Sequence, residues 1–185
     1  MIPGLTLYPD FITPAEEAEI LGILDAHPWR GDLQRRVQHY GYRYDYKARQ
    51  ITPDLYLGPL PVWLENLAHF LVQNGLFPNV PDQVIVNEYL PGQGIAPHID
   101  CVPCFGGVIA SLSLGSDVLM DFGRPDGSEK ISHRLPARSL VVMTGPARYH
   151  WQHSIAKRKT DGVDGQKILR QRRVSLTFRQ VVMGT

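Results

Sequence analysis

The sequence has 185 residues, the length of one domain with a substantial core. Its net charge of +1 gives no overall attraction to nucleic acid or to an acidic membrane surface. No apolar run is long enough to cross a membrane, the first residues lack a signal-peptide pattern, and the two cysteines make no disulfide framework. We therefore expect a single-domain, monomeric, cytoplasmic protein that does not bind membranes.

Two helices are predicted in the first half of the chain. The first begins after Thr13, whose side chain suits an N-cap, and runs to about Ala26 with Pro14 at its first position. The second covers Pro61–Asn74, where large apolar residues recur at helical spacing. We expect both helices to pack against a sheet.

Between these helices, residues 29–49 combine cationic and aromatic side chains. In a strand, Tyr40, Tyr42, Tyr44 and Tyr46 would share one face. Aromatic faces stack on unpaired bases and cations bind phosphates, so the segment is a candidate nucleotide-recognition lid. The alternative is a hairpin whose tyrosines pack on the helices and whose charges are solvated. The candidate substrate-binding residues are Arg35, Arg36, Tyr40, Tyr42 and Tyr44.

From residue 83 onward the pattern changes to short strands separated by turns. Such a series is typical of a sandwich or jelly roll, and it predicts a mainly β fold with flanking α-helices. The predicted strands are Val84–Leu90, Val108–Leu114, Val118–Phe122, Ile131–Leu135, Ser139–Thr144 and Arg173–Val182.

The stretch Val86–Asp100 predicts a strand, a tight turn and a second strand that carries a metal-binding pattern. After the turn, His98 and Asp100 share one face. Together with a distant histidine they would form the facial triad of a non-haem Fe(II) site, which leaves coordination positions open. A His-x-Asp pair is common by chance, so it needs independent support. The spacing does not choose the third ligand among the candidates His133, His150 and His153.

The last predicted strand supplies that support. From Arg173 to Arg179, polar or cationic residues alternate with apolar ones, so one face is buried and the other lies in solvent or in a polar cavity. The two arginine Cα atoms would be about 20 Å apart. In a cavity, their long side chains could present guanidinium groups to one small dianion. The alternative is a solvated face on an edge strand.

Five motifs of the sequence, which follow one another in the order found in the family, resemble the AlkB family of Fe(II)/2-oxoglutarate dioxygenases. Residues 35–42 are also similar to the substrate lid in the oxygenase domain of the tRNA-modifying eukaryotic AlkB homologue. The motifs are Asn87-x-Tyr89, Pro91-Gly92-x-Gly94-Ile95-x-x-His98-x-Asp100, Ser111-Leu112-Ser113-Leu114-Gly115, Trp151-x-His153-x-Ile155 and Arg173-x-Ser175-x-Thr177-Phe178-Arg179.

This resemblance implies one AlkB-like domain over residues 1–185, with helices and lid in 1–82 and a double-stranded β-helix, or jelly roll, in 83–185. It implies that Fe(II) is held by the catalytic residues His98, Asp100 and His153. The further implied reactants are 2-oxoglutarate as cosubstrate and molecular oxygen. The residues implied to bind the cosubstrate are Asn87, Tyr89, Arg173, Ser175 and Arg179.

The implied reaction is oxidative demethylation or hydroxylation of a modified base in nucleic acid. The lid favours RNA, particularly tRNA, and alkylated DNA remains open. Val102 replaces an acidic residue near the substrate base of the founding bacterial enzyme, so its base preference does not transfer. Ser175 replaces an asparagine of that enzyme, so one of its cosubstrate contacts does not transfer either. Two other classes also remain: oxidation of a protein side chain, and a metal-binding jelly roll without turnover. The open coordination positions of the implied iron site, together with two arginines that could bind one dianion, argue against a metal-binding jelly roll without turnover.

Two weaker signals remain. Cys101 and Cys104 form one Cys-x-x-Cys, which is half a zinc site, so we expect free thiols in a loop, with a redox-labile pair as the alternative. A basic cluster flanks a Gly/Asp loop at 161–165 and could form a phosphate-binding rim or a set of solvated charges. Its members are Lys157, Arg158, Lys159, Lys167, Arg170 and Arg172.

Overall fold

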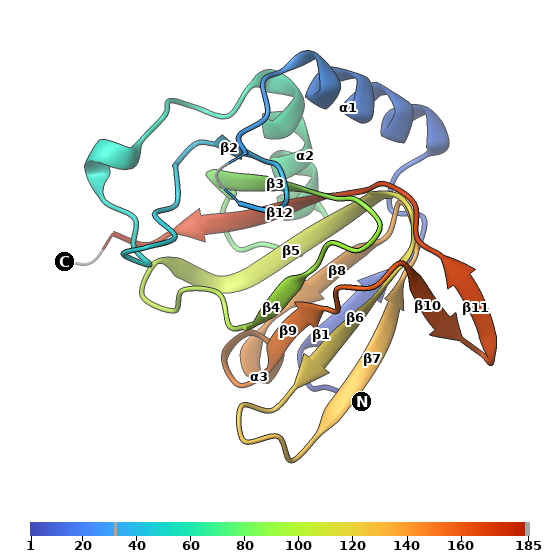
Figure 1. The fold of residues 1–185 in the computed structure, drawn as a ribbon. Coiled ribbons are helices and arrows are strands. Elements are labelled where there is room, and N and C mark those ends of the chain that lie inside the picture. The colour runs from blue at the N-terminus through green and yellow to red at the C-terminus, as the bar shows by residue number, and fades with distance from the viewer. Residues whose placement is uncertain (32, 184–185) are drawn as a thin grey trace.

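The computed structural model describes residues 1–31 and 33–183, which form two antiparallel sheets with helices on one side (Figure 1). The large sheet contains, in spatial order, β1 (Leu5–Tyr8), β8 (Leu140–Met143), β5 (Phe105–Gly115), β12 (Arg173–Val181), β3 (Gln83–Tyr89) and β2 (Val37–Tyr40). The small sheet contains β4 (Ile95–His98), β9 (Gln152–Ile155), β6 (Val118–Gly123) and β7 (Lys130–Leu135). This arrangement confirms the predicted jelly roll.

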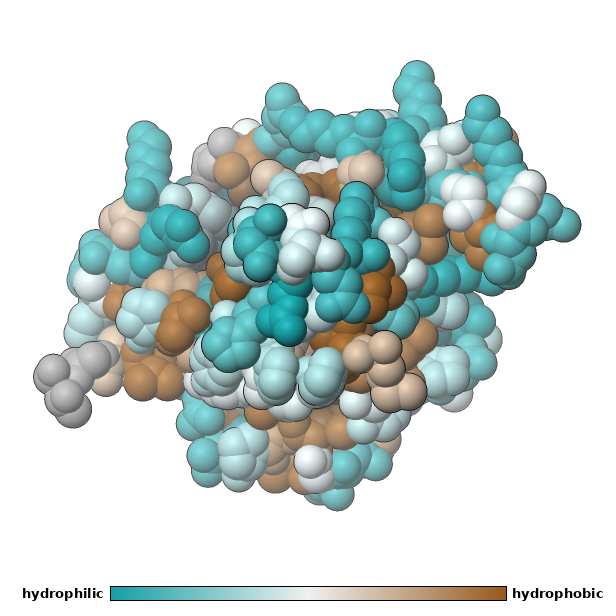
Figure 2. Space-filling view, turned by 90° about the horizontal axis from the view of Figure 1, so that it is seen from below, coloured by the Kyte–Doolittle hydropathy of each residue, from teal (hydrophilic) through white to brown (hydrophobic). Residues whose placement is uncertain are grey.

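A separate hairpin, formed by β10 (Thr160–Val163) and β11 (Gln166–Leu169), projects from the body of the molecule (Figure 1). Of the predicted Gly/Asp loop at 161–165, residues 161–163 belong to β10, and only Asp164 and Gly165 form the turn of this hairpin. Seen from below in Figure 2, the surface mixes hydrophilic and hydrophobic patches, so this view shows no continuous apolar face. Within the described part of the chain, no helix has the length and apolar character needed to cross a membrane.

Both predicted helices are present, as α1 (Pro14–Ala26) and α2 (Val62–Gln73), and both pack on the outer face of the large sheet. Thr13 caps α1 as predicted, since its hydroxyl accepts a hydrogen bond from the Glu16 amide and the Glu16 carboxylate accepts one from the Thr13 amide. This reciprocal pair satisfies two amides at the helix start. Two short helices, η1 (Pro53–Leu55) and α3 (Gly145–Tyr149), complete the described elements.

The core has two layers. One lies between the helices and the large sheet, and the other lies between the two sheets. Strand β12 lies between β5 and β3 in the large sheet, so both of its edges are paired, and the helix layer and the small sheet cover its two faces. Its cationic residues are therefore buried, with Arg173 2% and Arg179 7% exposed. The alternative of a solvated edge strand is wrong, because the polar face of β12 lies in a cavity between the sheets.

The six strands predicted with bounds exist with ends shifted by at most three residues, and β4 is the second strand predicted after the turn, but the sequence did not predict the other five described strands. All five are short; β1, β2 and β9 pair with strands far away in the sequence, whereas β10 and β11 pair with each other. Two of them, β1 and β2, come from the first 82 residues yet extend the large sheet on opposite edges. The sequence places a boundary at residue 82, with the helices and the lid before it and the jelly-roll core after it. The strands of the large sheet come from both sides of that boundary.

One ion-pair network joins the base of the lid segment to the large sheet and to α1. Glu88 on β3 is buried and accepts two hydrogen bonds from Arg36, both 2.8 Å long, and one of 2.7 Å from Arg172. Arg172 in turn binds Asp25 at the end of α1. The hydrogen bonds from Arg36 hold the pKa of Glu88 below its usual value, with help from Arg172 and against the opposing effect of burial.

We expect Glu88→Gln to lower the free energy of unfolding by about 2 kcal/mol at neutral pH, because both arginines lose their buried counter-charge. A lowered carboxyl pKa stabilises the fold above the ordinary value of 4.5, and this stability is lost as the pH falls through the folded-state pKa. The difference from wild type, measured by urea unfolding, should therefore shrink in acid. Glu65→Gln, on an exposed carboxylate, is the control. An undiminished difference in acid would contradict this account.

Candidate metal centre and adjoining cavity

Three side chains that could ligate a metal converge between β4 and β9. His98 ends β4, His153 lies opposite it on β9, and Asp100 follows β4 by two residues. One Asp100 carboxylate oxygen lies 3.4 Å from His98 Nε2 and 3.5 Å from His153 Nε2. One ligand atom from each residue fits within 4.8 Å of the others. Two imidazoles and one carboxylate are the donor set of the non-haem Fe(II) facial triad.

The surroundings keep these ligands in the protonation states that metal binding requires. Burial alone would raise the pKa of Asp100, but the charge of Arg179 and contacts with both histidines hold that pKa well below its usual value. Burial and the neighbouring His98 lower the pKa of His153 to about 3, so its ring is neutral at physiological pH. His98 Nδ1 lies 2.8 Å from the Ala96 carbonyl; donation to that oxygen leaves Nε2 to face the triad.

The other two candidate histidines lie elsewhere. His133 is on β7, where its ring packs against Phe122, and its Nε2 is buried without a hydrogen-bond partner among the described residues. His150 is exposed after α3 and lines a separate surface hollow beside Arg124. The structure therefore places only His153, of these three, beside His98 and Asp100 within the residues it describes.

A narrow cavity runs from the metal ligands between the two sheets, and it contains all five predicted cosubstrate residues. Arg173 lies opposite Tyr89, and Ser175 lies opposite Asn87, because β12 and β3 pair in this register. Apolar side chains from the facing strands complete the lining. The predicted members of the lining are Asn87, Tyr89, Arg173, Ser175 and Arg179.

Arg173 is the clearest sign that this cavity suits an anion. Its Nη2 donates to Ser113 Oγ at 2.9 Å, but its Nε and Nη1 are buried with no partner in residues 1–31 and 33–183. Burial lowers the Arg173 pKa to about 10, so the side chain is still a cation at neutral pH. Its guanidinium carbon lies 5.4 Å from the centre of the Tyr89 ring. A buried cation with unused donors fits a carboxylate ligand such as that of 2-oxoglutarate.

The second arginine of β12 has a different set of contacts. Arg179 Nε donates to the second carboxylate oxygen of Asp100 at 2.6 Å, and its Nη1 donates to Gln83 at 3.2 Å. From the sequence, the two arginines could present their guanidinium groups to one dianion if their strand face lay in a cavity. In the structure Arg173 retains unused donors, whereas Arg179 donates to Asp100, a candidate metal ligand.

The cavity opens into a wider hollow of about 580 Å³ that the lid segment closes on one side. Arg35, Tyr44, Tyr46 and Arg49 line this hollow together with His98 and other residues. Arg35 Nε donates to Asn87 Oδ1 at 2.8 Å. The lid therefore contacts the cavity directly and borders its mouth.

Of the five candidate substrate-binding residues, only Arg35 and Tyr44 line this hollow. Arg36 belongs to the ion-pair network of Glu88. Tyr40 packs against Trp63 of α2, and Tyr42 packs against Tyr56. The structure thus combines both interpretations of the segment, since part of it packs on the helix layer and part of it borders the hollow.

The tyrosine ladder fails because β2 ends at Tyr40. Gly41 has a φ of +75°, and a Cβ atom there would lie 1.8 Å from the Asp82 carbonyl oxygen, so the chain turns at a position that only glycine fits. Beyond that turn, alternate residues no longer share a face. Tyr46 and Arg49 were not among the candidates, although the shared parity of the tyrosines and the basic character of the segment pointed to them.

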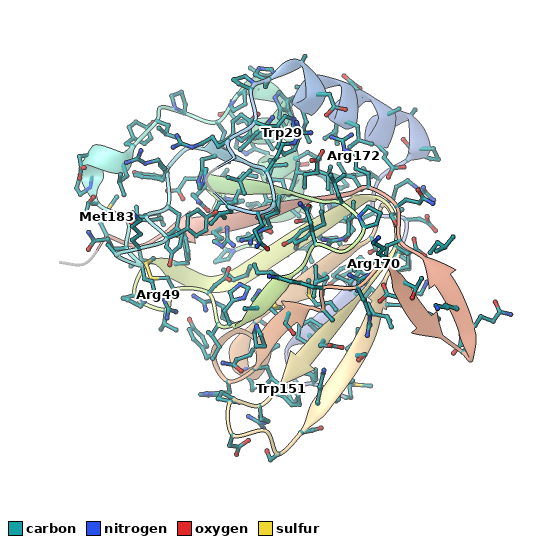
Figure 3. The ribbon with its side chains drawn as sticks, viewed as in Figure 1. Trp29, Arg49, Trp151, Arg170, Arg172 and Met183 are labelled. Atoms are coloured by element: carbon teal, nitrogen blue, oxygen red, sulfur yellow. A yellow bond between two sulfur atoms is a disulfide. The ribbon has the colours of Figure 1, made fainter. Side chains whose placement is uncertain are left out.

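The expectation of free thiols is wrong, because Cys101 and Cys104 are joined in a disulfide (Figure 3). A turn after Asp100 brings their Cα atoms to 5.3 Å, within the range that a disulfide spans. Both sulfurs are buried beside the Arg49 carbonyl of the lid segment, at 3.3 and 3.6 Å. The loop that follows the metal ligand therefore packs on the lid.

Arg148 also holds this loop, and no motif in the sequence indicated it. It lies on α3, is buried, and donates to the main-chain carbonyls of Asp100 at 2.9 Å and of Cys101 at 3.3 Å. It donates further to the carbonyls of Phe105 and Gly106, both at 3.2 Å. These four hydrogen bonds fix the backbone of the loop that begins at Asp100, at its carbonyl groups.

We expect Arg148→Leu to lower the free energy of unfolding by about 3 kcal/mol, because four buried carbonyl groups lose donors. It should also weaken metal binding, because Asp100 loses its fixed backbone position. Thermal unfolding and calorimetric titration with Mn²⁺ check the two effects. Arg134→Leu, which removes an exposed ion pair with Asp117, is the control. Equal effects of the two substitutions would refute a positioning role for Arg148.

The jelly roll, the facial triad and the buried arginine together define a non-haem iron oxygenase site. In agreement with this, residues 24–179 match the family model described as the 2OG-Fe(II) oxygenase superfamily. The chain belongs to that superfamily, and its curated relatives include AlkB homologues, as its sequence motifs predicted. It is an AlkB-like dioxygenase of a superfamily that uses Fe(II) as cofactor and 2-oxoglutarate and molecular oxygen as cosubstrates.

Two of these relatives are longer than the chain. The "Alkylated DNA repair protein ALKBH8 homolog" of Arabidopsis thaliana is 39% identical over 206 residues, covering 97% of this chain and 59% of the relative. The "tRNA (carboxymethyluridine(34)-5-O)-methyltransferase alkbh8" of Xenopus tropicalis is 38% identical over 203 residues, covering 97% of this chain and 32% of the relative. The solved structure of OsALKBH1 has the same fold, with a TM-score of 0.72, 20% identity, and coverage of 97% of this chain and 98% of that one.

Proposed function

We propose that the chain binds Fe(II) through His98, Asp100 and His153 and oxidises a modified or alkylated base in nucleic acid, with RNA favoured over DNA. The observation that carries this proposal is the buried guanidinium of Arg173, whose unused donors share a cavity with the metal ligands. When bound, the iron would activate molecular oxygen, which is the oxidant, with 2-oxoglutarate supplying two electrons as it is oxidised to succinate and carbon dioxide, and the chain would supply position, charge and exclusion of water. In this proposal, residues 1–185 act as one domain.

The cavity lining suggests a separate task for each side chain. Arg173, beside Tyr89 and Ser175, would neutralise one carboxylate of 2-oxoglutarate. Asn87, held by Arg35, would bind the cosubstrate nearer the metal, and Arg179 would keep Asp100 ionised and oriented. Met120, Val141 and Met143 line the same cavity and would keep water away from the reacting atoms.

The wider hollow has the features that an unstacked base requires. The rings of Tyr44 and Tyr46 meet edge to face with centroids 5.0 Å apart, and Phe105 lies 5.9 Å from Tyr44. Arg35 and Arg49 bring positive charge to the same hollow. Flat aromatic surfaces beside cations are how proteins hold single-stranded nucleotides. The similarity of the lid to that of a tRNA-modifying homologue favours RNA.

Anaerobic reconstitution with Fe(II) and 2-oxoglutarate tests the metal and cosubstrate site. We expect the weak visible charge-transfer band of the chelated complex in wild type, and its loss in His153→Ala, because the variant lacks one ligand. His133→Ala is the control, since His133 lies away from the triad and should leave the band intact. Absence of the band in folded wild-type protein would overturn the proposed site.

Removing the buried cation should abolish turnover without removing the metal. We expect Arg173→Met to weaken 2-oxoglutarate binding by about a hundredfold, because the carboxylate loses a desolvated partner. The variant should still bind Mn²⁺ in calorimetric titration, while succinate formation falls to background. Arg134→Met, at the surface, should change neither measurement. Wild-type affinity for 2-oxoglutarate in Arg173→Met would contradict the assignment.

Oligonucleotide binding separates the substrate classes. We expect single-stranded RNA to bind in a manner that weakens steeply with salt, because phosphate contacts release counterions. Tyr44→Ala should weaken binding by about tenfold through lost stacking, whereas Tyr42→Ala, outside the hollow, should not. Fluorescence anisotropy at several salt concentrations measures both. Tighter binding of DNA would reverse the preference, and no binding of either nucleic acid would favour a protein side chain as substrate.

A further inference from the structure

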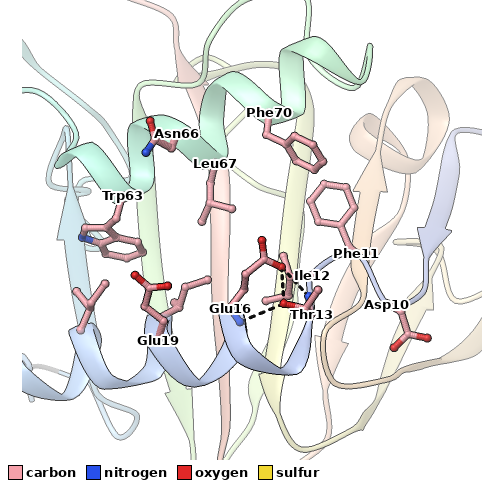
Figure 4. Close-up of a pocket in the computed structure, with 12 residues that line it drawn as sticks. Asp10, Phe11, Ile12, Thr13, Glu16, Glu19, Trp63, Asn66, Leu67 and Phe70 are labelled. Atoms are coloured by element: carbon pink, nitrogen blue, oxygen red, sulfur yellow. Dashed lines mark hydrogen bonds between the residues drawn. The ribbon is translucent and has the colours of Figure 1, made fainter.

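A second hollow, of about 490 Å³, lies between α1 and α2 on the helix side of the large sheet, away from the metal centre (Figure 4). Phe11 and Phe70 stand at one end with ring centroids 5.5 Å apart, and Trp63 stands toward the other. Leu67 lies between these ends. We call this hollow the helix groove. Its apolar lining is partly exposed, although the helices could have closed over it.

The helix groove has an acidic lining. Among the described residues, Asp10, Glu16 and Glu19 line it and no lysine or arginine does; Asp10 is paired at 3.4 Å with Arg138 outside the lining, so the net negative charge of the groove comes from Glu16 and Glu19. The absence extends along the sequence, since no lysine or arginine occurs anywhere from residue 50 to residue 123 or from residue 10 to residue 29. Hydrogen bonds from Thr13 lower the pKa of Glu16, so this carboxylate stays ionised. The cations of the chain belong to the lid, the later strands and their loops.

This segregation of charge decides what kind of partner fits. Nucleic acid is repelled by the carboxylates of the groove. A symmetric pairing of two copies through this face would bring Glu16 and Glu19 of one copy toward those of the other. A partner with apolar side chains flanked by lysine or arginine satisfies both the apolar lining and its acidic border.

We propose that the helix groove docks a basic amphipathic helix of a partner protein. A groove between two neighbouring helices accepts the side chains of a third, which anchors at positions i, i+3 or i+4, and i+7. Helix α1 has 13 residues and is therefore about 20 Å long, which matches a partner helix of three to four turns. The docked helix lies on the opposite side of the large sheet from the cavity, so docking leaves the proposed catalytic site open.

The test uses two synthetic helical peptides of about 14 residues. Both carry leucine at the anchor positions; one has lysine and the other glutamate at the flanking positions. We expect the wild-type protein to bind the lysine peptide saturably, with affinity that falls as salt rises, and to ignore the glutamate peptide. Fluorescence anisotropy of labelled peptide gives the affinities, and analytical ultracentrifugation gives the oligomeric state.

Three variants in the helix groove and one control variant locate the binding. Glu19→Lys should weaken it by about tenfold, mainly through slower association, and Phe70→Ser should weaken it by about tenfold or more. Glu129→Lys makes the same charge change on the exposed turn between β6 and β7 and should alter affinity less than twofold. Asn66 is exposed on the groove lining, and Asn66→Arg should also weaken binding of the lysine peptide. This substitution removes no apolar contact, so the variant replaces Phe70→Ser if Phe70→Ser unfolds.

Several outcomes would overturn the proposal. Equal binding of the two peptides, or no binding of the lysine peptide at about millimolar concentration, would remove the charge argument. Equal effects of Glu19→Lys and Glu129→Lys would place binding outside the groove. A wild-type dimer that Phe70→Ser dissociates would identify a second copy as the occupant. Succinate formation should be unchanged in Glu19→Lys, which separates this proposal from the proposed function.

Discussion

A buried ion pair between the two sheets is the contact on which the candidate metal centre depends. Arg179 comes from the large sheet, and Asp100 follows a strand of the small sheet, with 2.6 Å between Arg179 Nε and Asp100 Oδ2. Each charge would be costly to bury without the other. The pair therefore constrains the distance between the sheets at the point where the three metal ligands meet. Arg148 donates a hydrogen bond to the main-chain carbonyl of the same aspartate, so Asp100 is fixed at both its side chain and its backbone.

Local features of this fold could be predicted from the sequence, because neighbouring residues alone determine them. Thr13 and Glu16 form the start of α1 within one helical turn. The alternation from Arg173 to Arg179 defined a strand with one polar face, and His98 and Asp100 lie two residues apart. The third ligand depends on the pairing of β4 with β9, which joins residues more than fifty positions apart. Spacing therefore could not choose it, and only resemblance to a family pointed to His153.

Most of the features that sequence reasoning missed depend on contacts across the fold, and the disulfide, between cysteines three residues apart, is the local exception. The tyrosine ladder breaks at Gly41 because the Asp82 carbonyl occupies the space that a side chain would need. The disulfide forms because a turn brings Cys101 to Cys104. Arg148 stands in a short helix without a motif, and its partners are main-chain carbonyls, which have no signature in a sequence.

The unused donors of Arg173 also affect the resistance of the protein to unfolding and proteolysis. Without an anion, the folded chain retains a desolvated cation whose hydrogen-bonding capacity is partly unmet. A bound carboxylate removes this cost in the folded state and has no equivalent site in the unfolded chain. Thermodynamic linkage then makes resistance to unfolding and proteolysis rise with the concentration of the bound acid. In the proposed function that acid is 2-oxoglutarate, so the abundance of the protein would follow the supply of a central metabolite, independently of any catalytic turnover.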